Sequence, residues 1–439
     1  MKTYEKYKET GIEWIGEIPK HWEIVPIKYS LQIPLTDGPH ETPKLHQSGI
    51  PFISAESIKN DKIDFSKKRG FISEEEHQRF SLKYKPKLGD VYMIKSGATT
   101  GNLARVETDR EFNIWSPLAA FRPAPEKTTT DFLFFYMKSS RFFSAVELGW
   151  NYGTQQNIGM NVLENLKMVR PPLSEQTAIA KYLDLKTAEI DQLIAEKKQL
   201  VELYQEEKTA IIDQVVTKGI NPNAKFKESG IEWLGDIPEN WEVVSLKWVS
   251  NIYSGGTPSK NKPEYWTNGT IPWLNSGTVN QWDITEASEY ITEEALNKSS
   301  AKWIPEKAIL MALAGQGKTK GMVAQVQFKC TCNQSMGIII PNEKIDNRFL
   351  LYWLKRNYQN IRNLGGGDKR DGINLEMIGG IPLPFFEVSE QTKIVQHIEK
   401  ESDRIDIKIN KAEKYINLLT EYRTSLISEV VTGKIKVIS

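Results

Sequence analysis

The chain has 439 residues, of which 39% are hydrophobic and 26% are charged, as in a typical water-soluble globular protein. This length is too great for one compact core and predicts about two to four domains. The net charge of +1 neither supports nor excludes a nucleic-acid partner. The longest apolar runs, 308–314 and 336–340, fall far short of the roughly 20 residues that cross a bilayer, and the first residues lack an apolar signal segment. We therefore expect a cytoplasmic protein that does not bind a membrane.

A unit that begins near residue 8 occurs twice. Residues 8–25 read KETGIEWIGEIPKHWEIV and residues 227–244 read KESGIEWLGDIPENWEVV, at an offset of 219 (230 − 11). Later landmarks recur in the same order: 37–43 is echoed by 254–258, 50–52 by 271–273, 174–177 by 389–392, and 215–217 by 430–432. The chain is therefore predicted to be two copies of one unit, each with a variable globular part followed by a helical part.

Mixed α/β structure is predicted for the two globular parts, 1–173 and 221–388. Runs rich in β-branched and aromatic residues, separated by Gly, Pro and Asn, predict strands at 90–94, 101–106 and 307–312. Short helices are expected at 131–148 and at the equivalent 348–364.

Four tryptophans recur unchanged between the copies. They are Trp14 and Trp22 in the first copy, and Trp233 and Trp241 in the second. A buried indole commonly anchors packing, whereas an exposed indole can stack on a base. We interpret these four as packing anchors, because residues that read different base sequences should differ between the copies.

Two polar loops differ in chemistry at equivalent places. The loop at 153–157 is crowded with amides, whereas its partner at 367–371 is charged. Gln and Asn read adenine in the major groove of DNA, and Arg or Lys reads guanine. Different chemistry at one place is what two readers of different sequences require; the alternative is an ordinary solvated loop.

The segment 312–319, ALAGQGKT, fits a relaxed phosphate-loop pattern. A phosphate loop must open a helix, but the following 321–326 predicts a strand, and the equivalent 95–101 lacks Gly-Lys-Thr. We therefore interpret 312–319 as a β-turn whose lysines reach phosphate or a base edge. The candidate DNA-contacting residues of both copies are Lys95, Thr99, Thr100, Gln155, Gln156, Asn157, Lys318, Lys320, Lys369 and Arg370.

The sequence contains no constellation typical of catalysis or metal binding. Cys330 and Cys332 are the only cysteines and the five histidines are scattered, so we expect two small side chains packed in a strand and no metal site. A glycine-rich dinucleotide fingerprint is missing, as is an Asn-Pro-Pro-Tyr or Asp-Pro-Pro-Tyr segment. We therefore expect no catalytic residue and no cofactor bound by this chain.

The helical parts, 174–220 and 389–439, carry apolar stripes at steps of three and four, typical of a coiled coil. The stripes comprise Leu183, Ile190, Leu193, Leu200, Tyr204 and Ile211 in the first copy, and Ile398, Ile405, Ala412, Tyr415, Leu419, Tyr422 and Leu426 in the second. Ser174 is the expected N-cap of the first helix, and Gly219 and Gly433 mark the helix ends. Since a lone helix would expose its stripe, we expect these helices of about 60 Å to pair. The alternative is that each packs on its own globular part.

The order of these parts resembles the specificity subunits of type I restriction-modification systems, over essentially the whole chain. The resemblance is carried by Gly11-Ile12-Glu13-Trp14 with Ile18-Pro19 and Trp22, and by the same set at 230–241. Further elements are the 37–43 segment, the 153–157 loop with Asn161, and the Pro-Leu-Ser-Glu-Gln-Thr entry to the first helix. The second entry, at 387–392, lacks the preceding proline pair.

The resemblance implies an α+β fold, with two mixed α/β target-recognition domains in pseudo-two-fold tandem, separated by two long helices that form an antiparallel coiled coil. Each domain is then expected to read one half of a bipartite double-stranded DNA target. The helices are expected to set the spacing and to dock two modification (methyltransferase) subunits. S-adenosylmethionine, ATP and Mg are expected on partner subunits, and whether restriction (motor) subunits join stays open.

Two other functions compete with this interpretation. One is an enzyme, either a stand-alone methyltransferase or a nucleoside triphosphatase, which the missing cofactor motifs oppose. The other is a coiled-coil scaffold that binds only protein, which the unlike globular copies oppose. Binding of S-adenosylmethionine or ATP by the isolated chain tests the first, and DNA binding together with a partner tests the second.

Overall fold

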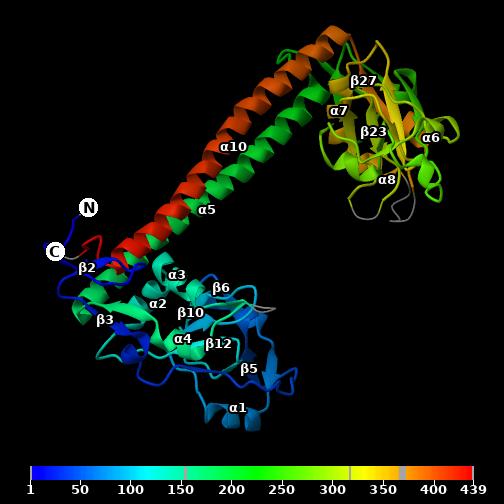
Figure 1. The fold of residues 1–439 in the computed structure, drawn as a ribbon. Coiled ribbons are helices and arrows are strands. Elements are labelled where there is room, and N and C mark those ends of the chain that lie inside the picture. Colours follow the sequence, from blue (N-terminus) through cyan, green and yellow to red (C-terminus); the bar gives the residue numbers. More distant parts are fainter. Residues whose placement is uncertain (1, 153–155, 316–317, 365–371, 438–439) are drawn as a thin grey trace. The chain divides into compact units, whose positions relative to one another are not determined.

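The computed structural model describes residues 2–152, 156–315, 318–364 and 372–437. It divides into two compact units, of which unit 1 comprises 1–199 with 412–439, and unit 2 comprises 200–411. Each unit contains one globular part and one half of each long helix, α5 (Leu173–Lys218) and α10 (Val388–Val431) (Figure 1). Among the described residues, no helix has the length and apolar character needed to cross a membrane.

Unit 1 is built on a four-stranded sheet with strand order β10 (Leu103–Arg105), β9 (Val91–Ile94), β12 (Leu118–Phe121) and β4 (Thr36–Asp37). A three-stranded sheet joins β11 (Asn113–Ile114), β5 (Ile50–Ile53) and β8 (Gly70–Ile72). Paired strands are β1 (Tyr7–Glu9) with β2 (Glu17–Pro19), β3 (Glu23–Pro26) with β15 (Lys167–Arg170), β6 (Ile58–Lys59) with β7 (Lys62–Ile63), and β13 (Asn151–Tyr152) with β14 (Gln156–Asn157). The helices of its globular part are α1 (Glu74–Ser81), α2 (Thr130–Lys138), α3 (Ser140–Leu148) and α4 (Met160–Asn165).

Unit 2 is built on a five-stranded sheet with strand order β19 (Ser250–Ser254), β26 (Met336–Pro341), β23 (Ile309–Ala312), β24 (Val323–Val326) and β21 (Asp283–Ile284). Its smaller sheets are β22 (Glu289–Ile291), β20 (Ile271–Leu274) and β25 (Thr331–Cys332), then β16 (Phe226–Glu228) with β17 (Asp236–Pro238), and β18 (Glu242–Ser245) with β27 (Pro382–Phe385). The helices of its globular part are α6 (Glu293–Asn297), α7 (Asn347–Arg356), α8 (Tyr358–Asn363) and α9 (Leu375–Gly379).

The main sheets form where the sequence places continuous apolar runs. All four residues of β9 and all four of β23 are buried, as expected for strands covered on both faces. In unit 1, α2 packs on β9 and β10, and in unit 2, α7 packs on β24. The core of unit 1 extends from this sheet to Leu183 of α5 and Val430 of α10. The core of unit 2 likewise reaches Val216 of α5 and Ile398 of α10.

Both short helices predicted as single pieces are broken in two. Ser139 ends α2 and also caps α3, where its hydroxyl accepts a hydrogen bond from the Phe142 amide at 3.2 Å. Asn357 stands between α7 and α8, where its side-chain amide donates to the Trp353 carbonyl at 2.8 Å and does not cap α8. A Ser or Asn side chain competes with helical backbone bonds, and this explains the breaks that the apolar pattern did not reveal.

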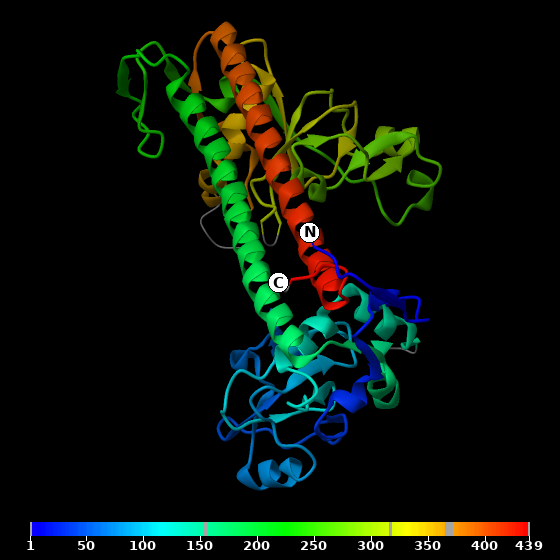
Figure 2. The same cartoon turned by 90° about the vertical axis from the view of Figure 1, so that its left-hand side faces the viewer.

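The long helices pair in opposite directions in both units. In unit 1, Arg423 Nε lies 2.7 Å from Asp191 Oδ1, so the C-terminal half of α10 meets the N-terminal half of α5. In unit 2, Lys208 Nζ lies 2.7 Å from Asp406 Oδ2, so the other two halves meet. Figure 2 shows α5 in green and α10 in orange to red running side by side. The expected antiparallel pairing is therefore confirmed within each unit.

The buried stripe differs in part from the prediction. Leu183, Ile190, Ile398, Ile405, Ala412 and Leu426 are buried, and Leu200, Tyr204, Ile211 and Leu419 are half-buried. Leu193, Tyr415 and Tyr422 are instead 43%, 49% and 44% exposed. The neighbouring Ile194 and Ile416 are more buried. At 193 and 415 the more buried residue thus lies one position later, since positions i+3 and i+4 share a helix face and packing decides between them.

The C-terminal ends of α5 and α10 follow the predicted pattern, but the start of α5 does not. Gly219 and Gly433 have φ of +73° and +75°, the left-handed conformation that ends many helices. At the start of α5, however, the Pro172 carbonyl accepts the Gln176 amide at 3.0 Å, so Pro172 is the N-cap. Ser174 lies inside the first turn, and its prediction as N-cap is wrong.

Candidate nucleic-acid interface

The repeated Ser-Glu-Gln-Thr segments fasten each globular part to the start of its helix. Gln176 is fully buried, and its amide oxygen accepts hydrogen bonds from the Thr129 amide at 2.9 Å and the Thr128 hydroxyl at 3.0 Å. Its amide nitrogen donates to the carbonyls of Lys127 and Pro171 at 3.0 and 2.8 Å. Every polar atom of this side chain therefore holds the globular part against α5.

Unit 2 repeats this attachment. Gln391 is fully buried, accepts from the Asp346 amide at 2.8 Å, and donates to the carbonyls of Lys344 and Phe386 at 3.3 and 2.8 Å. We name the contacts of Gln176 and Gln391 the glutamine latch. It fixes where each globular part begins on its helix.

Two of the repeated tryptophans dock on the same segments. Trp22 is buried and donates from Nε1 to Glu175 Oε2 at 3.0 Å, and Trp241 donates in the same way to Glu390 Oε1 at 3.1 Å. These indoles are packing anchors, as predicted. Of the other pair, Trp14 is half-buried, whereas Trp233 is 36% exposed.

Two segments of unit 1 that were predicted to touch DNA lie side by side beyond β9. The Lys95 carbonyl accepts a hydrogen bond from the Ile158 amide at 2.9 Å, and Ser96 forms an isolated antiparallel bridge with Asn157. Thr99 and Asn157 are exposed on these segments. The fold therefore brings 95–101 and 156–158 together as one polar edge, although 55 residues (156 − 101) separate them in the sequence.

Lys95 and Thr100 were expected at the surface, and the structure corrects this. Lys95 is only 9% exposed, and its Nζ lies 3.3 Å from Asp37 Oδ2. Thr100 is 7% exposed and donates from its hydroxyl to the Gly97 carbonyl at 2.7 Å. A short hydroxyl that closes its own turn cannot also project from it, so both residues support the loop from beneath.

Asp37 contacts two lysines and a histidine beside this loop. Lys83 Nζ is 2.5 Å from Asp37 Oδ1, and His40 Nε2 is 3.2 Å from Oδ2. Burial raises the pKa of the Asp37 carboxyl, but the hydrogen bond and charge of Lys83, together with Lys95, outweigh burial and lower it. One carboxylate facing two ammonium groups leaves positive charge next to the polar edge. Lys83 was missed in the sequence because no repeat or motif marks it.

Unit 2 brings the equivalent segments together. The Leu313 carbonyl accepts from the Ile373 amide at 2.7 Å, the counterpart of the bond in unit 1. Lys318 is exposed, and its carbonyl accepts from the Tyr358 hydroxyl at 2.5 Å. Lys320 is only 3% exposed, which corrects its expected place at the surface. Lys318 therefore faces solvent, whereas Lys320 is covered by the fold of unit 2.

The structure also bears on the remaining expectations for these loops. The segment 312–319 is followed by the strand β24, not by the helix that a phosphate loop requires, as predicted. Gln155, Lys369 and Arg370 lie outside the described residues. Gln156 is described only by its place in β14.

The two cysteines pack inside unit 2. Cys330 and Cys332 are both unbonded and fully buried, the latter in β25. Burial raises the pKa of the Cys330 thiol to about 12 and raises that of Cys332 as well, so both stay protonated and unreactive. In the described ranges, no cluster of His, Cys, Asp and Glu is arranged to hold a metal ion.

Comparison with known proteins identifies the family from two matched segments. Residues 19–203 and 238–417 each match the family described as "Type I restriction modification DNA specificity domain". The two matches cover most of the chain and coincide with its two copies. The chain belongs to this family. It is a specificity subunit of a type I restriction-modification system, the non-catalytic subunit that recognises DNA.

Individual relatives extend this similarity over the whole length. The putative type I restriction enzyme MjaX specificity subunit of Methanocaldococcus jannaschii is 28% identical over 99% of this chain and 97% of its own. The EcoR124I/EcoR124II specificity subunit of Escherichia coli is 31% identical over 52% of each chain. The HsdS subunit of Thermoanaerobacter tengcongensis shares the fold, with a TM-score of 0.58 over 95% of this chain and 98% of its own, at 14% identity. A chain from a type I system studied for complex assembly reaches a TM-score of 0.73, also at 14% identity, over 95% and 99%.

Proposed function

We propose that the two globular parts are independent readers of the two halves of one bipartite double-stranded DNA target. The loop pair carries this proposal. In each unit a segment beyond a buried strand is bonded to the segment before a short helix, through the same backbone contact. The exposed side chains differ: Thr99 and Asn157 in unit 1, and Lys318 in unit 2. Amide and hydroxyl side chains hydrogen-bond to different base edges than an ammonium group does.

The paired helices are proposed to dock two identical modification subunits and to set the gap between the half-sites. Asp406 corresponds to Asp191, and Arg423 to Lys208, at the same offset of 215 (406 − 191 = 423 − 208). The ion pairs Asp191–Arg423 and Asp406–Lys208 are therefore equivalent. Two equivalent surfaces suit two copies of one partner.

The chemistry of the system is proposed to reside on these partners. S-adenosylmethionine for methyl transfer, and ATP and Mg for any restriction (motor) subunits, would bind there rather than on this chain. A cytoplasmic location follows from the DNA substrate.

The test uses the chain assembled with its modification subunits, and maps the methylated sites in DNA. We expect Asn157→Ala to relax one half-site and leave the other unchanged, because a base-reading contact contributes about 1–3 kcal/mol of discrimination. Lys318→Ala should alter only the other half-site if Lys318 reads a base. If it contacts phosphate, it should weaken binding to all sequences and lower the salt slope by about one. A change in both half-sites from Asn157→Ala would contradict independent reading.

A further inference from the structure

In both units a cavity lies between the globular part and the long helices. In unit 1 a cavity of about 470 Å³ is lined by Asp61, Gly101, Lys138, Phe143 and Thr424, among others. In unit 2 a cavity of about 420 Å³ is lined by Trp282, Arg348, Tyr352, Glu399 and Asp406, among others. Apolar packing is therefore interrupted at this contact, and polar contacts have to bridge it.

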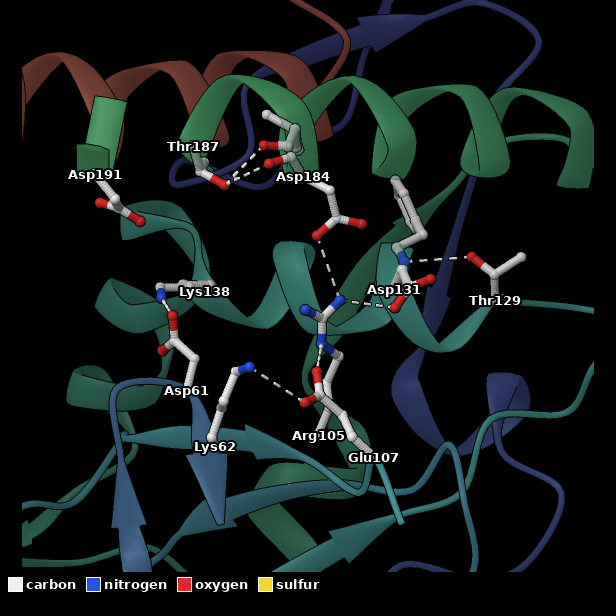
Figure 3. A network of polar contacts seen from close by, with 12 residues as sticks. Asp61, Lys62, Arg105, Glu107, Thr129, Asp131, Lys138, Asp184, Thr187 and Asp191 are labelled. Atoms are coloured by element: carbon white, nitrogen blue, oxygen red, sulfur yellow. Dashed lines mark hydrogen bonds and ion pairs between the residues drawn. The ribbon is translucent and has the colours of Figure 1, made fainter. Parts of the chain in front are cut away.

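In unit 1 the polar bridge lies outside the lining of this cavity and is made by Arg105 of β10 (Figure 3). Its Nη1 lies 2.8 Å from Asp131 of α2 and 3.5 Å from Asp184 of α5, and its Nε lies 3.6 Å from Glu107. Only 20% of the Arg105 side chain is exposed. One guanidinium thus connects the sheet, the covering helix and the long helix.

In unit 2 the bridge is made by Arg348 of α7. Its Nη1 lies 2.6 Å from Asp283 of β21 and 3.2 Å from Gln325 of β24, and its Nε lies 4.0 Å from Glu399 of α10. Here the covering helix supplies the arginine and the sheet supplies an acid, the reverse of unit 1.

The acid on the long helix is the part that both units retain. Glu399 corresponds to Asp184 at the offset of 215 (399 − 184) that also relates the two glutamine latches (391 − 176). Arg348 stands where α2 has Asp131, since 348 − 131 equals 355 − 138, the offset of the lysines in the last turns of α2 and α7. The two globular parts therefore reach the same helix position with an arginine from different elements. Because the arginine comes from a different element in each unit while the acid keeps its place, the ion pair with the long helix is the feature that the two units share.

Both bridges are partly shielded from water. The side chains of Arg105 and Arg348 are 20% and 29% exposed, and the acids that they meet on the long helices are 44% and 50% exposed. Lys138 of α2 and Lys355 of α7 occupy equivalent positions on the covering helices, and desolvation lowers the pKa of each to about 8. Burial also raises the pKa of the Asp184 carboxyl, although Arg105 opposes this. A partly buried ion pair is screened less than one at an open surface.

We propose that Asp184 with Arg105, and Glu399 with Arg348, are positioning residues that fix the angle of each globular part on the helix pair and thereby set the gap between the half-sites. The glutamine latch holds each part at the start of its helix, and a body held at one place can still rotate. The acid lies eight residues further on, about 12 Å along the helix, and provides the second point of attachment. This inference rests on the proposed reading of a bipartite target.

The test is selection of DNA from a library in which the two half-sites are joined by gaps of varied length, using the complete complex with modification subunits. Asp184→Asn and Glu399→Gln should each reduce the preference for the natural gap over gaps one base pair longer or shorter, by roughly tenfold, while both half-site sequences stay unchanged. Asp184→Glu should keep the natural gap, because Glu399 performs the same role in unit 2. Glu74→Gln, an exposed acid on α1 hydrogen-bonded to Gln78 of its own helix, is the matched control and should behave as wild type.

The possible outcomes separate the two proposals. A wild-type complex that selects no split sequence overturns the proposed function, and the positioning role with it. A split target whose gap is equally strict in wild type, Asp184→Asn and Glu399→Gln overturns the positioning role alone. Altered bases in a half-site would also overturn it, since a positioning residue should not change what is read. If Asp184→Asn fails to fold, Glu399→Gln decides.

Discussion

At the scale of the residue, the glutamine latch shows how one side chain joins two parts of the fold. Gln176 is an uncharged amide with a donor and an acceptor end, and backbone groups on both sides of it need both. An aspartate or glutamate would lack the donor, and an apolar residue would lack both. The recurrence of Gln391 with equivalent bonds indicates that this requirement belongs to the repeated unit.

Replacing the latch glutamine should destabilise the protein. Gln176→Leu keeps a similar volume but leaves the Thr129 amide and the Lys127 and Pro171 carbonyls without their partner. We expect the free energy of unfolding to fall by about 2–4 kcal/mol, measured by urea denaturation of the full chain. Thr177→Ala is the control, because Thr177 is exposed and bonds only within its own helix, and should change stability by less than about 0.5 kcal/mol. Equal effects of both variants would contradict the importance of the latch.

The half-buried Lys355 of unit 2 should make stability depend on pH. Burial lowers the pKa of Lys355 from 10.5 to about 8 in the folded state, so the unfolded chain binds the proton more tightly. Protonated Lys355 therefore disfavours folding below pH 8, and this effect fades as the pH rises from 8 to about 10.5. We expect Lys355→Met to raise the free energy of unfolding at pH 7 by roughly 1–2 kcal/mol, allowing for partial exposure, and by much less at pH 10.

Paired urea titrations of wild type and variant at both pH values check this expectation. Lys298→Met is the control, since the exposed Lys298 pairs with Glu294 one turn away. A stability difference between Lys355→Met and wild type that is the same at pH 7 and pH 10 would show that the Lys355 proton is not involved.

At the scale of the element, periodicity in the sequence was the reliable guide. Both long helices, the buried strands β9 and β23, and the strand after 312–319 all form as predicted. Side-chain hydrogen bonds were the main source of error. Ser139 breaks a helix that the apolar pattern predicts as continuous, and Asn357 does the same where its side-chain amide donates to the Trp353 carbonyl. Such local competition leaves no trace in apolar spacing.

The candidate interface was predictable as segments but not as side chains. Divergence between the copies pointed to 95–101 and 153–157, and the fold brings 95–101 against 156–158. The direction of each side chain depends on what lies beneath the loop. Asp37 draws Lys95 inward, and the turn buries Lys320 while Lys318 stays exposed. A tertiary partner such as Asp37, 58 residues (95 − 37) away in sequence, cannot be found from the loop itself.

At the scale of the whole molecule, the two units are assembled from the same set of parts taken from different places in the chain. In unit 2, the end of α5 leads directly into the segment of Trp241, and Gly219 lies against that indole. In unit 1, the segment of Trp22 lies against Gly433 beyond the end of α10, and Lys2 pairs with Lys436. A contact between distant residues in unit 1 thus replaces the covalent connection of unit 2.

The proposed spacing role of the helices leads to a prediction for the complete chain. Facing residues of the antiparallel pair have numbers that sum to 614, as in 191 + 423 and 208 + 406. Deleting 193–199 together with the facing 415–421 removes one seven-residue repeat from each helix and keeps the buried stripes in register. Each helix becomes about 10 Å shorter, so we expect the gap between half-sites to shorten by about three base pairs.

Both half-sites should keep their base sequences in this deletion variant, because neither polar edge is touched. Mapping of methylated sites in cells that carry the variant and its modification subunits provides the measurement. Deletion of 193–199 alone is the control, since it shifts one helix against the other and should abolish methylation. An unchanged gap in the double deletion would show that something other than helix length sets the spacing. Altered bases at an unchanged gap would instead contradict the division between reading parts and spacing helices.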